Sequence, residues 1–293
     1  MNYKNILEKA SRNLNHIKGK VFDIVDVKKP NSIEYAVQLS KIISKLSPLI
    51  GNLIEFSTIS ELNKYNWQSL GIWERQDPGF PDAIFKSDKI SPNPGIEIKA
   101  WFPLATEITA RFKDSVTMFE PEHINLALIA WLPEYVIYGK PKIIDVLTVG
   151  AKGVAQARDK HYHKPPRYIV LEPEDTTGRT GNLQQTNTNG YKFQEDKSNI
   201  QEAQKIVDKW GAALLEYSPK KEYQDMIKRL QSKFIYRLDT NYAKIDRIEH
   251  EDIEHFKSKV ENTLFQGKTI KEWRQILSSG STDLLRDELQ RLL

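Results

Sequence analysis

A chain of 293 residues with 39% hydrophobic residues can bury one large core or at most two small ones. It contains no cysteine, which excludes disulfides and thiolate zinc sites, so any metal must be bound by oxygen atoms or by the six histidines. The formal net charge of +4 permits a polyanionic partner without arguing for one.

The N-terminal part, residues 1–66, is predicted to be helical. Its first stretch, MNYKNILEKASRNLNHIK, lacks the apolar block of a signal peptide, and no apolar run in the chain is long enough to cross a bilayer. We therefore expect a cytoplasmic protein with no membrane contact. Residues 31–65 carry apolar residues at helical spacing in two pieces, and Ser47-Pro48 is typical of a cap followed by proline in the first turn of the second helix.

Residues 67–175 carry strand signals and form the predicted catalytic core. The apolar runs PDAIF, GIEIKAWF, INLALIAWLP, KIIDVLTV and RYIVLE are separated by turn-forming or polar residues. SDKISPNP predicts a hairpin that makes PDAIF and GIEIKAWF antiparallel neighbours. Because side chains alternate along a strand, Glu97 and Lys99 share one face, and Asp82 can reach the same end.

The remaining chain is divided between a polar segment and further helices. Residues 176–197 are expected to form a long polar loop, and residues 198–293 return to helical spacing. Thr269 and Glu272 fit a capping box at the start of TIKEWRQIL. Helices at both ends of a central mixed β-sheet predict one α/β domain over residues 1–293, and the two-domain alternative rests on length alone.

Three charged residues, Asp82, Glu97 and Lys99, interrupt the apolar pattern of the predicted hairpin. Two carboxylates in a partly dry site repel each other strongly, which makes sense if a divalent cation lies between them and an ammonium group is nearby. The alternative is an exposed hairpin with a cross-strand ion pair of little energetic consequence. The pattern favours a metal site.

Pro81-Asp82, followed after fourteen residues by Glu97-Ile98-Lys99, resembles the signature of the PD-(D/E)xK nuclease superfamily, and type II restriction endonucleases are its best fit. The resemblance implies a restriction-endonuclease-like fold in which Asp82 and Glu97 bind Mg²⁺. The Ile98 carbonyl can add a ligand, and Lys99 orients or activates the attacking water.

Members of this superfamily often recruit a further acid from the helix before the hairpin. Glu55, which follows Gly51 by four residues, resembles that arrangement and is our prediction. Glu61 is the alternative, because it falls near the angle of Ile50 and Ile54 on a helical wheel.

Polar residues in three segments are candidates for contacts with double-stranded DNA. Each set has a plain alternative as a solvated face or, for the third, a disordered surface loop. Those after the catalytic strand are Thr106, Thr109, Arg111 and Lys113; those suited to the phosphate backbone include Arg158 and Lys160; those suited to base edges are Arg179, Asn182, Gln184, Gln185, Asn187 and Asn189.

The sequence therefore predicts a Mg²⁺-dependent type II restriction endonuclease. A homodimer is expected, because two active sites related by a two-fold axis most simply cut both strands of a palindromic site. A structure-specific repair or recombination nuclease is one alternative. A DNA-binding protein on the same scaffold that does not cut is another.

Overall fold

The structure is a computed structural model, and contacts divide the chain into two compact units. The first comprises Met1–Ile108, Phe119–Lys152 and Glu251–Leu293, and the second Thr109–Met118 and Gly153–His250. The prediction of a single nuclease domain stays a prediction, because a division by contacts does not show whether either unit folds alone. The structure describes residues 2–76, 79–104, 119, 122–162, 168–171, 190–193, 201–202, 204–205, 208–209, 218, 220–231, 248–279 and 281–293.

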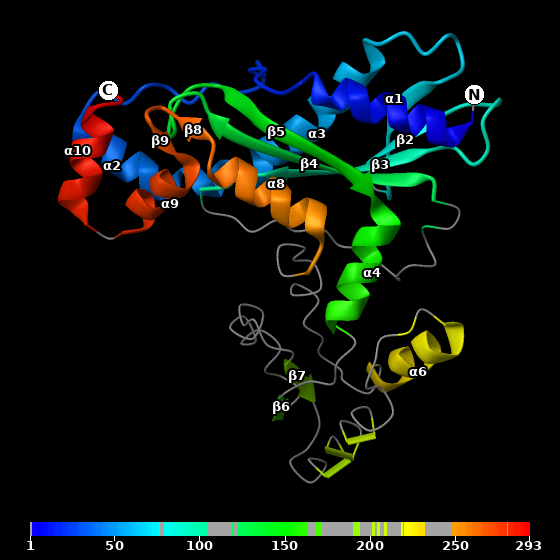
Figure 1. Cartoon of the computed structure of the whole chain (residues 1–293). Helices are drawn as coiled ribbons and strands as arrows, with labels where there is room; N and C mark the ends of the chain where they lie inside the picture. Colours follow the sequence, from blue (N-terminus) through cyan, green and yellow to red (C-terminus); the bar gives the residue numbers. More distant parts are fainter. Residues whose placement is uncertain are drawn as a thin grey trace. The chain divides into compact units, whose positions relative to one another are not determined.

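The first unit is built around a five-stranded sheet with the strand order β1-β2-β3-β4-β5 (Figure 1). The β3–β4 pair is parallel and the other neighbours are antiparallel, so the predicted mixed sheet and the predicted hairpin of PDAIF with GIEIKAWF are both confirmed. β4 lies inside the sheet and is almost wholly buried, as its continuous apolar sequence requires. The strands are β1 (Ile72–Arg75), β2 (Ala83–Lys86), β3 (Gly95–Trp101), β4 (Ile124–Pro133) and β5 (Pro141–Gly150).

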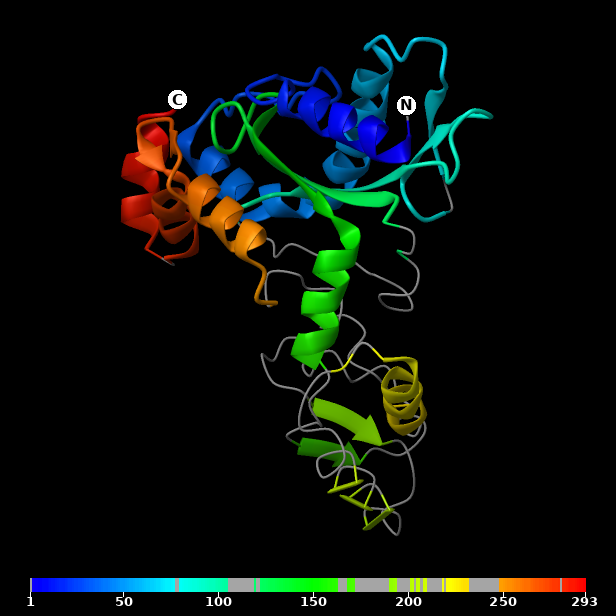
Figure 2. The ribbon, with the colours of Figure 1, turned by 45° about the vertical axis from the view of Figure 1, so that its right-hand side comes forward.

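Helices cover both faces of this sheet (Figures 1 and 2). A Cβ added at Gly51 in α3 (Ser47–Asn63) would lie 3.6 Å from the Cβ of Ala100. The ring of Phe256 in α8 (Glu251–Glu261) lies 6.0 Å from that of Trp101. Because Ala100 and Trp101 are consecutive residues of β3, their side chains point to opposite faces, so α3 and α8 pack on opposite sides of the sheet.

The N-terminal helices confirm the predicted helical region but correct one cap. α1 (Tyr3–Asn15) contacts α3 and β5, while α2 (Ile33–Ile42) leads through a short 3₁₀ helix, η1 (Ile43–Leu46), into α3. Ser47 is the first residue of α3 rather than its cap, and Leu46 precedes it without a side-chain capping bond. The prediction failed because the chain is already helical at Ser47, whereas an N-cap side chain needs an extended backbone.

The outer edge of β5 is partly covered by the segment that follows α1. The main-chain N–H of Gly19 donates to the carbonyl of Ile143 at 2.8 Å, and the N–H of Ile143 donates to the carbonyl of Lys20 at 2.9 Å. The main-chain groups of Ile143 on this edge are therefore paired within the chain.

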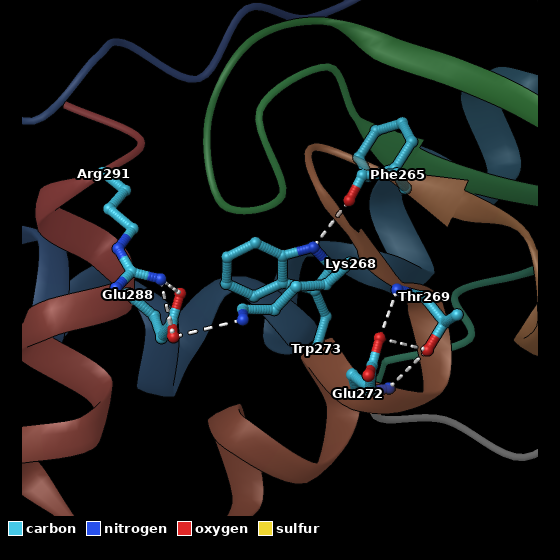
Figure 3. Close-up of polar contacts among 7 residues, drawn as sticks. All are labelled: Phe265, Lys268, Thr269, Glu272, Trp273, Glu288 and Arg291. Carbon is cyan, nitrogen blue, oxygen red and sulfur yellow. Dashed lines mark hydrogen bonds and ion pairs between the residues drawn. The ribbon is translucent and has the colours of Figure 1, made fainter.

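The C-terminal end of the first unit is a small hairpin followed by two helices (Figure 3). The predicted capping box is confirmed, since the Thr269 hydroxyl accepts from the N–H of Glu272 at 3.2 Å and the N–H of Thr269 donates to Glu272 Oε2 at 2.7 Å. Glu288 pairs with Lys268 and Arg291, each at 3.1 Å, which ties the last helix to the hairpin. The last helix packs against α2, from the other end of the chain (Figure 1). The elements are β8 (Leu264–Phe265), β9 (Lys268–Thr269), α9 (Ile270–Ser278) and α10 (Thr282–Gln290).

In the second unit, β6 (Tyr168–Leu171) confirms the strand predicted for RYIVLE and pairs in parallel with β7 (Gly190–Phe193). β7 falls inside the predicted polar loop, because the alternating aromatic residues of GYKF are strand formers within a polar segment. The helices α4 (Ala151–Tyr162), which crosses the boundary between the units, and α6 (Lys221–Gln231) are also described. Across the described residues, no helix has the length and apolar character needed to cross a membrane.

Candidate functional site

The candidate site lies where β2 and β3 stop pairing through their main chains. Their registered pairs are Ala83 with Ile96 and Ile84 with Gly95. Just beyond them, the N–H of Asp82 donates to Glu97 Oε2 at 3.2 Å, and the N–H of Ile98 donates to Asp82 Oδ2 at 2.7 Å. Each carboxylate thus accepts from the opposite main chain in place of a carbonyl, which explains why two apolar strands tolerate these charges here.

Lys99 contacts both carboxylates. Its Nζ lies 2.7 Å from Glu97 Oε1 and 3.1 Å from Asp82 Oδ2. The exposed fraction of the side chain is 21% for Lys99, 20% for Asp82 and 6% for Glu97. An exposed hairpin with a solvated ion pair does not describe these residues. One ammonium faces two carboxylates, so the three groups carry a net negative charge when all are ionised.

The pKa values reflect this crowding. Burial raises the pKa of Glu97 to about 6; the nearby Asp82 also raises it, and the ion pair with Lys99 opposes the rise. For Lys99, burial favours the neutral amine, but Glu97 and Asp82 hold its pKa above the ordinary value of 10.5. The carboxylates therefore prevail over desolvation, and Lys99 is an ammonium at neutral pH.

Glu55 on α3 belongs to the same electrostatic neighbourhood. Burial raises its pKa from 4.5 to about 7, the negative charges of Asp82 and Glu97 add to the rise, and Lys99 and Arg75 oppose it. The protonated form of Glu55 is therefore populated at neutral pH.

Glu61, the alternative acid, is engaged elsewhere. Burial disfavours its charge, but hydrogen bonds from Lys20 at 2.7 Å and Lys64 at 2.5 Å hold the pKa of Glu61 below its ordinary value. Of the two acids, Glu55 is the one in the field of Asp82 and Glu97.

Two contacts fix α3 so that Glu55 is brought to the site. Gly51 lies one helical turn before Glu55 on the same side of the helix and faces Ala100 of β3, since a Cβ added at Gly51 would be in van der Waals contact with the Ala100 Cβ. At the C-terminal end, the Asn63 amide donates to the carbonyl of Trp73 at 2.8 Å and accepts from its N–H at 2.9 Å. This pair joins α3 to the edge strand β1, which leads into the Asp82 turn.

Two neighbours of the site were not predicted from the sequence. The positive charge of Arg75, at the end of β1, lowers the pKa of Glu55. Gly95 allows Pro81 to pack, because a Cβ there would lie 2.3 Å from Pro81 Cγ. No spacing rule in the sequence points to Arg75. Gly95 could have been identified, because a glycine at the start of a strand often marks a place where another part of the chain packs closely.

Most of the predicted DNA contacts lie outside the described residues: Thr106, Thr109, Arg111, Lys113, Arg179, Asn182, Gln184, Gln185, Asn187 and Asn189. The two that are described lie in the second unit, on α4. Arg158 is buried, with 5% of its surface exposed, and Lys160 is exposed. These assignments stay predictions, and burial leaves little of Arg158 to meet a phosphate.

A hard divalent cation fits this site by donor chemistry. Asp82 and Glu97 offer carboxylate oxygens, the donors that Mg²⁺ prefers. Burial and, to a smaller extent, nearby carboxylates raise the pKa values of Glu97 and Glu55, and a bound cation would favour the ionised form of both. Within the described part of the chain, no cluster of three or more His, Cys, Asp or Glu residues is arranged to hold a metal ion. A Mg²⁺ ion bound by Asp82 and Glu97 would need further ligands, which main-chain or solvent oxygens could supply.

No family model, curated protein or solved structure matches the chain.

Proposed function

We propose that the protein is a cytoplasmic, Mg²⁺-dependent type II restriction endonuclease that hydrolyses DNA phosphodiesters at specific sites, leaving 5′-phosphate and 3′-hydroxyl ends. The observation that carries the proposal is the joining of Asp82, Glu97 and Lys99 into one largely buried, hydrogen-bonded group at the point where two strands part. Glu55 adds a third acid whose pKa responds to the same charges.

In this proposal each group has a distinct task. Asp82 and Glu97 would hold Mg²⁺, with the Ile98 carbonyl as a further ligand. The ion supplies counter-charge for the extra negative charge of the transition state and makes a bound water more acidic. Lys99, an ammonium at neutral pH, is suited to hold the attacking water by donating a hydrogen bond rather than to remove its proton. The pKa of Glu55 is raised to about 7 without a metal ion, and the positive charge of Mg²⁺ would lower it, so Glu55 would be ionised and able to accept a proton at neutral pH.

The test is cleavage of a plasmid of known sequence by the purified chain, with Mg²⁺ and with EDTA, followed by sequencing of the ends. Asp82→Ala, Glu97→Gln and Lys99→Met should each reduce the cleavage rate by at least about 100-fold, as expected for loss of a group that acts on the transition state. Discrete bands that require Mg²⁺ and are absent from the variants would give the recognition site and the overhang together.

Matched controls come from the same hairpin. Asp88 and Lys86 are exposed and lie at or beyond the far end of β2. Asp88→Ala and Lys86→Met should therefore cut at the wild-type rate. Full activity in any one of the three site variants would refute the assignment of that residue.

The alternatives are separate outcomes of the same experiment. Cutting only of branched or damaged DNA would indicate a repair or recombination nuclease. DNA binding without cutting at any Mg²⁺ concentration would indicate a binding protein. The mass of the cutting species in solution, measured by light scattering with and without its DNA site, tests the expected homodimer.

A further inference from the structure

We propose that Gln76 is a positioning residue that holds the turn before Asp82. Its catalytic meaning rests on the proposed nuclease function, whereas its effect on Asp82 can be measured without any cleavage. Gln76 directly follows the last residue of β1, and neither a charge nor a spacing in the sequence singles it out.

Gln76 forms hydrogen bonds to this turn through both its main chain and its side chain. Its N–H donates to the carbonyl of Asp82 at 2.9 Å, one residue beyond the last registered pair of β1 with β2. With the amide turned so that Nε2 faces the main chain, the side chain donates to the carbonyls of Phe80 and Pro81, each at 3.2 Å. Three consecutive carbonyls, from Phe80 to Asp82, are thus hydrogen-bonded to one residue.

The surroundings make room for this contact and limit the movement of the turn. A Cβ at Gly79 would lie 2.9 Å from the Cβ of Gln76, so the absence of a side chain there lets Gln76 fold back over the turn. On the other side, Pro81 fills the space above Gly95. The ring of Phe80 packs edge-on against Phe119 at 5.7 Å between centroids.

The consequence concerns the direction of the Asp82 carboxylate. Asp82 Oδ2 accepts from both the N–H of Ile98 at 2.7 Å and the ammonium of Lys99 at 3.1 Å, so a shift of the main chain at residue 82 would disturb both contacts. A functional side chain whose position must be accurate to a fraction of an ångström needs neighbouring residues that hold it in place. Gln76 supplies donors to the carbonyls on both sides of the Pro81–Asp82 peptide.

The test compares Gln76→Met, which keeps the length of the side chain and removes its donor, with Gln266→Met. Gln266 is a matched control because its Nε2 also donates to a main-chain carbonyl, that of Glu134 at 2.7 Å, in the same unit. The first readout is amide hydrogen exchange of Ile98, whose N–H is bound by Asp82. The second is the Mg²⁺ concentration for half-maximal cleavage, with thermal melting of both variants as a reference.

Gln76→Met should accelerate exchange at Ile98 by about tenfold, through loss of two hydrogen bonds, and Gln266→Met should not. Gln76→Met should also raise the half-maximal Mg²⁺ concentration severalfold, although the two variants melt alike. Unchanged exchange at Ile98 would overturn the positioning role. If the wild type cuts DNA, and Gln76→Met speeds exchange at Ile98 without changing the Mg²⁺ dependence, Gln76 does not contribute to cleavage through Asp82. If the wild-type chain does not cut at all, the proposed function fails, and the exchange result still decides whether Gln76 holds Asp82.

Discussion

The raised pKa of Glu55 predicts that removing its charge stabilises the protein in alkaline but not in acidic solution. The unfolded chain ionises Glu55 near its ordinary pKa of 4.5, and the folded chain ionises it near 7. The cost of the buried charge is therefore absent below about pH 4.5, grows between the two values and is complete above about pH 7. The rise corresponds to at most roughly 3 kcal/mol, and partial exposure reduces this, so Glu55→Gln should add about 1–3 kcal/mol to the free energy of unfolding at pH 8.

The assay is urea unfolding of the wild type and the variant at pH 4, 6 and 8 without divalent cations. Glu61→Gln, on the same helix, is the matched control with the opposite sign. Its folded-state pKa is lowered by Lys20 and Lys64, so its stabilising contribution is present above the unfolded pKa and is lost as the pH falls. Glu61→Gln should cost about 0.5–1 kcal/mol at pH 8. A Glu55→Gln variant that is equally stable relative to wild type at pH 4 and pH 8 would refute the electrostatic account of the site.

Three further predictions use other contacts of the site. Mg²⁺ should raise the melting temperature of the wild type more than that of Glu55→Gln, because the ion offsets a negative charge that the variant lacks. An equal rise in both proteins would show that Glu55 does not interact with the bound ion. Gly95→Ala should cost about 1–3 kcal/mol in urea unfolding, because its Cβ would lie 2.3 Å from Pro81 Cγ, whereas Gly150→Ala, with no atom within 4 Å of its Cβ, should cost much less. Asn63→Ala breaks both hydrogen bonds to the main chain of Trp73 and should destabilise by about 1–3 kcal/mol; a change below about 0.5 kcal/mol would show that solvent replaces the amide.

Local sequence patterns were enough to predict the hairpin and which of its residues meet. Alternation along β3 placed Glu97 and Lys99 on one face, and the proline-rich turn brought Asp82 to them. The start of α3 was misplaced by one residue, because the preceding 3₁₀ helix depends on packing that no local pattern records.

Contacts between distant segments were not accessible in the same way. A helical wheel favoured Glu61, because it cannot show that Glu61 pairs with Lys20, which lies 41 residues before it in the chain. The role of Gln76 was equally hidden, since it comes from hydrogen bonds of Gln76 to the carbonyls of residues 80–82 and not from the residue type.

The pairing of the outer strands limits how two copies of this chain can assemble. At Trp73 on β1, both main-chain groups are bound by the Asn63 amide, and at Ile143 on β5 both are bound by the segment after α1. Neither position offers a free donor and acceptor to an incoming strand, so the sheet is protected there from edge-to-edge association. The homodimer that we propose would therefore not continue the sheet from one copy into the next at these two positions.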